Sequence, residues 1–360
     1  MLNIVTGALR TPQKYTVQPT AQQARSASIR VEWGINLKET IDIQNGNLNL
    51  LPPPTPPTAL VPRYVYSGRA LAEVVHNDPS FQFFYQAAAI LGSLGVKPNP
   101  GWPVYLNQGS FVTLNGGADI FNCVADVSQY ALIHTWYWKW QHYRKLRPEV
   151  FALWINDVKN GLVPNKNNFD IADFIFSNKV LDDIYIQNNL WIPNANSYTL
   201  PQTYREGSPT HPAYNSGHAI IAGACVTLLK IFYDGEQLWS TVPGVISGAL
   251  SGIPNAVVQA DAAGINLVAY NGDITNITVG GELNKLADND GTGRDFAGIH
   301  YRSDIQTALL LGEEVAIHYI QDMLCTMVEN NIDGSYPSIT FRKFNGCLTT
   351  VKPTLCLKNR

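Results

Sequence analysis

The chain has 360 residues, a formal net charge of -3 at pH 7 and 15% charged residues. This length allows one large domain or two average ones, and it suffices to bury a sizeable core. The small net charge and the lack of long Lys/Arg runs predict no nucleic-acid partner. Because the charged fraction lies below the roughly 25% of an average globular chain, we expect much buried surface and a homo-oligomer, a dimer or larger.

The longest apolar stretch, at 219–229, falls short of the ~18 residues that a membrane helix needs, so we expect a soluble protein without membrane contact. The N-terminus lacks a charged segment followed by an apolar one, which predicts no signal peptide and, by default, a cytoplasmic location. The five cysteines are scattered without Cys-x-x-Cys spacing and indicate neither a disulfide framework nor a zinc site. Only Cys347 and Cys356 are close enough in sequence to be candidates for a pair.

The first segment, residues 1–65, has weak periodicity and ends in the run LLPPPTPPTALVP. Repeated proline forbids helix and favours extended polyproline structure, so we interpret this segment as an arm that wraps the body or a neighbouring subunit. The pattern then becomes helical. Asp78 is a predicted N-cap, followed by Pro79 at the first helical position, and the helix is expected to end at Gly95.

Apolar residues at three and four spacing predict further helices over 117–146, 148–161, 217–234, 281–289 and 303–329. The long polar connections at 162–210 and 235–280 exceed the usual loop length, so we expect them to form the walls of a site. Near the end of the chain, β-rich residues flank Asn345-Gly346, the dipeptide of a type I′ hairpin turn.

The first of three motifs is KWQHYRKLRP at 139–148. At 100° per residue, Lys139 and Arg147 are separated by about 80° and two turns of one helix, so both can reach one point beyond the helix end. Taken alone, the segment is more simply interpreted as a solvated cationic helix C-terminus, which the helix dipole favours.

The second motif is HPAYNSGHA at 211–219. A Ser-Gly step that enters a helix presents backbone N–H groups, the positive end of the helix dipole and the Ser216 hydroxyl to an anion, and Gly217 allows close approach. His218 could contact the same anion as a donor or acid–base group. The simpler interpretation is an ordinary N-cap followed by a core histidine.

The third motif is GRDFAGIHYRSD at 293–304. Arg294 and His300, six positions apart, carry little weight by themselves. Ser303 or Asp304 could simply cap the next helix.

The combination is more specific than its parts. In this order, Lys-x7-Arg-Pro, Ser-Gly-His and Gly-Arg-x5-His-x3-Asp resemble the signature shared by vanadium-dependent haloperoxidases and related acid phosphatases. KWQHYRKLRPE, EGSPTHPAYNSGHA and GRDFAGIHYRSD are similar to segments of the algal and cyanobacterial bromoperoxidase branch, and the similarity runs from about 75 to 345. The chain departs from that branch at Asn215, where proline is usual, and it is shorter, mainly before the first motif.

The resemblance implies an all-α fold, a helical-bundle haloperoxidase fold with an extended N-terminal arm and a small C-terminal β-hairpin. We expect a single domain over 1–360. Within it we distinguish the arm at 1–65, a helical catalytic core at 66–330, and the hairpin and tail at 331–360.

The resemblance also implies one vanadate per subunit, with His300 as its metal ligand. The cofactor-binding positions carried over from the family are Lys139, Arg147, Ser216, Gly217, His218, Arg294 and His300. Planar arginine forks suit the oxygens of such an anion. His218 would be the acid–base group for hydrogen peroxide, and Lys139 would polarise bound peroxide.

His211 corresponds to a histidine that marks bromoperoxidases where chloroperoxidases tend to have phenylalanine, and Trp138 is expected near the halide. The implied reaction oxidises bromide or iodide, with chloride as a weaker hypothesis, using hydrogen peroxide. The product, hypohalous acid, would halogenate a small organic acceptor. The four remaining histidines match no motif position and are interpreted as surface or core residues: His76, His134, His142 and His318.

Two alternatives stay open at this point. A vanadate-inhibited acid phosphatase of the same superfamily would use His300 as nucleophile, through a phosphohistidine, and His218 as general acid. Three features weigh against the phosphatase. These phosphatases usually have six residues, rather than seven, between the lysine and Arg-Pro. His211 and the lack of membrane spans also favour the peroxidase. A catalytically silent oxyanion-binding subunit is disfavoured by the complete set of site residues.

Overall fold

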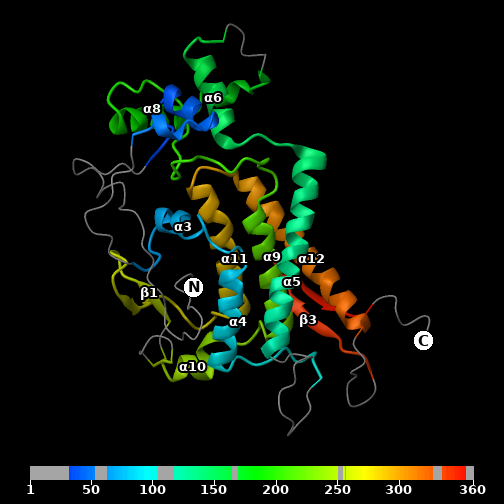
Figure 1. Cartoon of the computed structure of the whole chain (residues 1–360). Helices are drawn as coiled ribbons and strands as arrows, with labels where there is room; N and C mark the ends of the chain where they lie inside the picture. The colour runs from blue at the N-terminus through cyan, green and yellow to red at the C-terminus, as the bar shows by residue number, and fades with distance from the viewer. Residues whose placement is uncertain are drawn as a thin grey trace.

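A bundle of helices surrounds α9 (Gly217–Phe232) in the computed structural model, which describes residues 32–52, 63–103, 117–163, 169–249, 254–255, 257–326 and 335–353. Three helices pack on α9: α5 (Gly117–Tyr137), α11 (Val279–Phe296) and α12 (Arg302–Thr326) (Figure 1). All residues of α9 from Ala219 onward are buried. A helix that is apolar on every side belongs at the centre of a bundle, which is where α9 lies.

Two glycines allow α9 and α12 to approach each other closely. A Cβ built on Gly223 would lie 2.2 Å from the Leu309 carbonyl oxygen, and one on Gly312 would lie 2.2 Å from the Ile220 carbonyl oxygen. Any side chain at either position would collide with backbone. The helix that carries the second motif at its start is therefore fixed firmly against the helix that follows the third.

Shorter elements surround the bundle (Figure 1). On one side lie α3 (Gly68–Val74), which packs on α11, and α4 (Gln82–Leu94). Beyond one end of the bundle lie α2 (Leu37–Gln44), η1 (Leu48–Leu50), α6 (Pro148–Lys159), α7 (Asp173–Phe176) and α8 (Lys179–Trp191). The remaining elements are η4 (Trp239–Thr241), α10 (Pro243–Ile246) and two antiparallel hairpins, β1 (Val258–Ala260) with β2 (Leu267–Ala269), and β3 (Ile339–Arg342) with β4 (Leu348–Val351).

The all-α prediction is confirmed, and α6, α9, α11 and α12 begin and end close to their predicted bounds, apart from the C-terminal end of α11. The C-terminal hairpin is also present, with Arg342 opposite Leu348. Its turn differs from the predicted type I′. Gly346 donates to the Lys343 carbonyl and has a φ of 83°, which fits a three-residue loop with glycine at the left-handed position.

Several boundaries differ from the sequence predictions. Residues 37–44 of the expected extended arm form α2, capped by the Asn36 side chain, whereas 1–31 and 53–62 lie outside the described residues. The connection at 162–210 contains α7 and α8, and that at 235–280 contains α10 and the β1–β2 hairpin. The suggested pairing of Cys347 also lies outside the described part, because Cys356 does. Within that part no helix is long and apolar enough to cross a membrane.

Candidate active site

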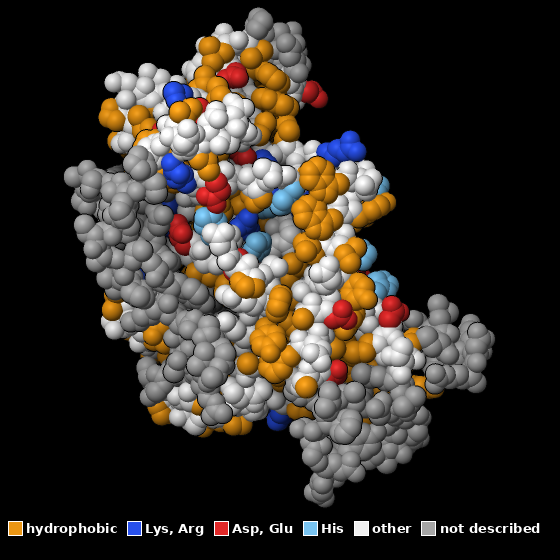
Figure 2. Space-filling view, in the orientation of Figure 1, with side chains coloured by type: hydrophobic (Ala, Val, Ile, Leu, Met, Phe, Trp, Pro, Cys, Tyr) orange, Lys and Arg blue, Asp and Glu red, His pale blue; other side chains and the backbone are white. Residues whose placement is uncertain are grey.

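The three motifs meet in a hollow on one face of the molecule, where histidine, lysine and arginine side chains gather (Figure 2). Five segments contribute to this hollow: the turn that follows α5, the start of α6, the loop before α9, the end of α11 and the loop before α12. Arg147 connects two of the motifs directly, because its guanidinium contacts both His211 and His300.

Lys139 and Arg147 do not lie on one continuous helix, contrary to the sequence prediction. After Tyr137 the chain forms one turn of π-helix, η2 (Trp138–Tyr143), and Arg144 adopts a left-handed conformation with φ 41°. Arg147 is extended and caps α6, since a residue before proline avoids helical geometry. The two cations still converge, but from two separate segments; π-turns of this kind are frequent at functional sites.

Lys139 is held by backbone carbonyls. Its side chain is 1% exposed, and Nζ donates to the carbonyl oxygens of Pro212 at 2.6 Å and Ala213 at 3.1 Å. Burial, with the charges of Arg147 and Arg294, lowers the pKa of Lys139 to about 6, although Asp304 acts in the opposite direction. The amino group therefore lies in a strongly cationic, desolvated environment that an anion would relieve.

Arg147 is also anchored by carbonyl oxygens. Nε donates to His211 O at 2.9 Å and Nη1 to Ile299 O at 2.8 Å. Nη1 also lies 3.0 Å from His300 Nε2, and Nη2 lies 3.0 Å from His211 Nδ1. Burial lowers the pKa of Arg147 to about 10, so the group stays charged at neutral pH.

Arg294 completes a set of three buried cations. From α11, its Nη1 donates to Val75 O at 2.5 Å and to the Tyr204 hydroxyl at 3.4 Å, and the guanidinium lies over the Tyr204 ring. Its buried Nε has no hydrogen-bond partner. Among the described residues, none of Lys139, Arg147 and Arg294 forms an ion pair with a carboxylate. Three buried basic side chains without an ion-pair partner and an unused N–H are the donor set that a multiply charged oxyanion requires.

The start of α9 faces the same region. Ser216 is the N-cap, fully buried, and its hydroxyl accepts from the Ala219 N–H at 3.4 Å. Its own N–H donates to the Asp304 carbonyl at 3.2 Å, which ties the second motif to the third. A Cβ on Gly217 would meet a single atom, Leu132 Cδ1 at 4.0 Å, so space is left open at the first turn, where helix N–H groups are free to bind an anion.

His300 is oriented by a carboxylate. Its Nδ1 lies 3.1 Å from Asp304 Oδ2, and Asp304 is fully buried. Because Asp304 also accepts from Lys145 Nζ at 2.8 Å and from the Tyr301 N–H at 3.1 Å, we assign it as an acceptor that takes the Nδ1 proton. Burial, followed by the charges of Arg147, Lys139 and Arg294, lowers the pKa of His300 well below its usual value. Nε2 then carries a lone pair on the side of Arg147, and a neutral ring with a free lone pair is the form in which histidine binds a metal.

His218 is paired with Asp78, which the sequence interpretation had assigned as a helix cap. Asp78 Oδ1 accepts from His218 Nε2 at 2.9 Å, and α4 begins four residues later, at Gln82, with Phe81 as its N-cap. Burial and the charge of Arg294 lower the pKa of His218, and the bond to Asp78 opposes this shift. Asp78 is thus a site residue that the motifs did not include, and Asp304, the last residue of the third motif, orients His300.

His211 lies behind Arg147, with Trp136 edge-on to its ring at 5.1 Å between centroids. Burial and the charges of Lys139 and Arg147 lower the pKa of His211 to about 3, so the ring is neutral. Trp138, expected near the halide, packs against His142 and Tyr143. Trp136, two residues before Trp138, is the tryptophan that contacts His211.

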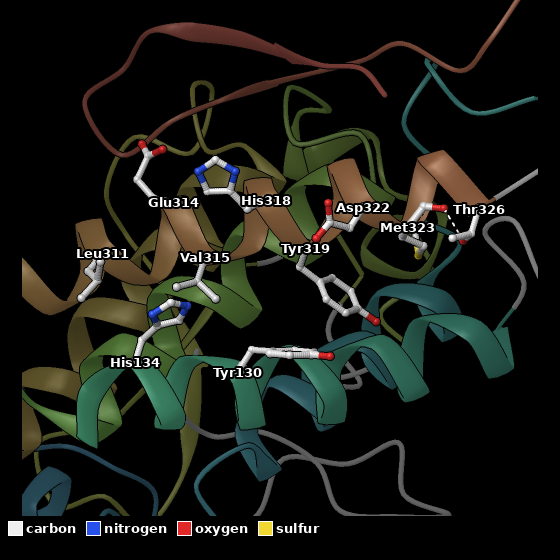
Figure 3. Close-up of a pocket in the computed structure, with 10 residues that line it drawn as sticks. All are labelled: Tyr130, His134, Leu311, Glu314, Val315, His318, Tyr319, Asp322, Met323 and Thr326. Carbon is white, nitrogen blue, oxygen red and sulfur yellow. Dashed lines mark hydrogen bonds between the residues drawn. The ribbon is translucent and has the colours of Figure 1, made fainter. Parts of the chain in front are cut away.

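A separate groove of about 610 Å³ runs between α5 and α12 (Figure 3). His134 and His318 line it together with Tyr130 and Tyr319, and no residue of the three cations or of the His218–Asp78 pair does. No residue of the three motifs lines this groove, so the motif residues come together in the polar hollow instead.

The chain is similar in sequence to known proteins of one kind. A family model described as the VCPO second helical-bundle domain matches residues 183–327. The vanadium-dependent bromoperoxidase of Corallina pilulifera is 36% identical over 284 residues, which cover 74% of this chain and 44% of the relative. That of Ascophyllum nodosum is 30% identical over 326 residues, which cover 88% of this chain and 53% of the relative.

A solved structure is similar as well. The homohexameric second vanadate-dependent bromoperoxidase of Ascophyllum nodosum matches with a TM-score of 0.77 and 26% identity, over 95% of this chain and 56% of that one. The chain belongs to the vanadium-dependent haloperoxidase family. It spans about half the length of the curated relatives that it matches.

Proposed function

We propose that this chain is a vanadium-dependent bromide peroxidase. It binds one vanadate and uses hydrogen peroxide to oxidise bromide or iodide to hypohalous acid, which halogenates small organic acceptors. The observation that carries the proposal is the gathering of three buried basic side chains around His300, whose Nε2 contacts Arg147 and whose pKa the charges of Lys139 and Arg294 also lower. The bromoperoxidase relatives support the same choice of cofactor and halide.

The residues that would hold the cofactor form what we call the cradle: Lys139, Arg147, Ser216, Gly217, Arg294 and His300. His300 Nε2 is the metal ligand, and its Nδ1–H bond to Asp304 keeps the ring in the binding orientation. Lys139, Arg147 and Arg294 bind the anion oxygens, with Ser216 and the Gly217 N–H at the start of α9. When bound, vanadate would supply a Lewis acid that activates peroxide without a change in its own oxidation state.

His218 exchanges protons during peroxide binding. Its Nε2 is bonded to Asp78, which leaves Nδ1 to take a proton from an oxygen in the cradle or return it. Lys139 increases the positive potential at the bound oxygens. His211, kept neutral between Arg147 and Trp136, forms an uncharged wall that we assign to the halide; chloride is a weaker substrate in this proposal because it is the harder halide to oxidise.

We also propose a homo-oligomer, because large exposed apolar side chains gather on α5 and η2 beside the hollow (Figure 2). Tyr130, Ile133, Trp136, Tyr137 and Trp140 are each between 39% and 53% exposed. Contiguous apolar surface of this kind marks an interaction site. The similar homohexamer supports assembly of copies of this chain, without fixing their number.

The test is peroxide-dependent bromination of a phenolic dye by anion-free protein, with and without orthovanadate and with phosphate as competitor. We expect bromination with vanadate alone, loss of it in His300→Ala, and full activity in the control His318→Ala, which lies in the distant groove of Figure 3. If the protein hydrolyses a phosphomonoester and vanadate yields no bromination, the phosphatase alternative replaces this proposal.

A further inference from the structure

A further histidine, His76, lies close to the cradle, although no motif includes it. His76, in the turn between α3 and α4, binds the Glu206 carboxylate through Nε2. Its ring stacks on Tyr204 with centroids 3.8 Å apart and planes 3° from parallel. Tyr204 donates to the Ala72 carbonyl at 2.7 Å and accepts from Arg294, so a single ring separates His76 from a cation of the cradle.

His76 and Asp78 also line one polar pocket. This pocket has a volume of about 330 Å³, and Glu73 and Asn77 contribute to its wall. A polar cavity of this size holds several water molecules. Asp78 binds His218 through Oδ1, whereas Asp78 Oδ2 is buried without a hydrogen bond. The pair that handles protons in the cradle therefore has a free acceptor atom on a residue that borders this pocket.

The proposed reaction needs such a route because it consumes a proton. Bromide, hydrogen peroxide and one proton give hypobromous acid and water: bromide loses two electrons to peroxide, the O–O bond breaks, and the proton completes the water. Each turnover must bring this proton from solvent to the cradle. Histidine is the side chain best suited to exchange protons near neutral pH, and His76 is 23% exposed.

Resting on the proposed function, we infer that His76 and Glu206 form the solvent end of a proton route that supplies the Asp78–His218 pair through water in this pocket. His76 does not touch the oxyanion, so it acts through other groups. Glu206 accepts the hydrogen bond of His76, and this bond lowers the pKa of the Glu206 carboxyl group.

The other charged groups around His76 fit this role. Burial raises the pKa of Glu73, and the charges of His76 and Arg69 act in the opposite direction. Asp78 faces the pocket from the turn, and Arg294 acts through Tyr204 from α11. The three carboxylates outnumber the two arginines, Arg69 and Arg294, and this balance draws protons toward the pocket.

A purely structural role is the competing explanation, because the stack on Tyr204 could serve only to hold Arg294. His76→Phe separates the two roles, since phenylalanine keeps a flat ring on Tyr204 and cannot carry a proton. The matched control is His318→Phe, an exposed histidine of α12 in the separate groove (Figure 3). Glu206→Gln is a second variant that leaves His76 in place.

The experiment measures kcat for bromination from pH 5 to 8 for all four proteins, with and without added imidazole, together with orthovanadate affinity by equilibrium dialysis. For His76→Phe we expect wild-type kcat at pH 5 and a loss of about tenfold at pH 8, restored by imidazole, with vanadate affinity unchanged. Glu206→Gln should show a smaller loss of the same pH dependence, and His318→Phe should match the wild type.

A deficit that is the same at every pH, or one that imidazole does not restore, would overturn the inference. So would a lower vanadate affinity in His76→Phe, because it would indicate that the stack only positions Arg294. If His76→Phe does not fold, the pH dependence of Glu206→Gln decides the question alone. A wild-type protein without vanadate-dependent bromination would instead refute the proposed function, a result distinct from these.

Discussion

The cost of burying Lys139 yields a quantitative prediction. Lysine in the unfolded chain is charged at pH 7, whereas burial and two neighbouring arginines lower the pKa of folded Lys139 from 10.5 to about 6. The folded protein without an oxyanion therefore binds fewer protons than the unfolded chain between these two values. Its free energy of unfolding must rise with pH across that range on account of this group.

Replacing Lys139 by methionine keeps the side-chain length and removes the charge. Each pKa unit corresponds to about 1.4 kcal/mol, so the shift costs the folded wild type at most about 5 kcal/mol at pH 7. Losing the hydrogen bonds to Pro212 and Ala213 offsets part of this gain at about 1 kcal/mol each. We therefore expect Lys139→Met to raise the free energy of unfolding by up to about 3 kcal/mol at pH 7 without an oxyanion.

Urea denaturation from pH 6 to 10 checks this expectation. The advantage of Lys139→Met should be greatest at pH 6 and should shrink toward pH 10, and the exposed control Lys159→Met should stay within about 0.5 kcal/mol of the wild type. Saturating orthovanadate should stabilise the wild type and leave Lys139→Met almost unchanged. A variant that is less stable than the wild type at pH 6 without an oxyanion would show that Lys139 is charged and well solvated, and the reasoning would fail.

Three further changes test the rest of the cradle. Asp304→Asn, which disturbs the orientation of His300, should weaken orthovanadate binding about 10- to 100-fold in equilibrium dialysis. Gly217→Ala should leave the melting temperature unchanged, because the added methyl group has room, but it should weaken vanadate binding because that group blocks close approach to the start of α9. Gly223→Ala is the contrasting variant. Its Cβ would lie 2.2 Å from a carbonyl oxygen of α12, so it should lose about 3 kcal/mol of stability or more. His211→Phe should lower kcat/KM for bromide relative to that for chloride by several-fold, and an unchanged ratio would remove His211 from the halide site.

Local signals explain which elements could be predicted from the sequence. Pro148 at the first position of α6 and Ser216 at the N-cap of α9 determine helix starts through their own backbone and side-chain chemistry, and both starts were predicted correctly. Asp78 has the same local chemistry, but its carboxylate is bound by His218, 140 residues away, and α4 starts later. A long-range partner overrides a capping preference, and the residues adjacent to Asp78 do not reveal it.

The connection at 162–210 was missed for a related reason. Within α8 only Leu181 and Asn188 are buried, so the helix lacks a wide apolar stripe and its pattern is weak. Ile155 of α6 and Ile171 pack against Leu181, and Asn188 donates to carbonyl groups of the following loop. This small cluster forms only after distant segments come together, which single-sequence periodicity cannot register.

The site residues were predictable by type, but their supports were not. The sequence motifs named the cations and histidines, whereas three consecutive carbonyl groups, at 211–213, hold both Lys139 and Arg147. Every residue has a carbonyl, so the sequence carries no mark of this function. Asn215, 1% exposed with its side-chain oxygen unpaired, stays the one residue of HPAYNSGHA for which the structure supplies no reason.

Support by carbonyl groups has a consequence for how the protein responds to its anion. A carboxylate anchor would position a cation and also neutralise it, whereas a carbonyl positions it and leaves most of the charge available. The folded protein therefore carries unfavourable electrostatic energy until an oxyanion binds. A ligand that binds only the folded state stabilises that state by mass action, by about 2.7 kcal/mol when the free ligand concentration is one hundred times Kd. The same three cations that make the hollow selective for a multiply charged oxyanion thus make the anion-free protein its least stable form, and thermal stability should increase with the fraction of cradles that are filled.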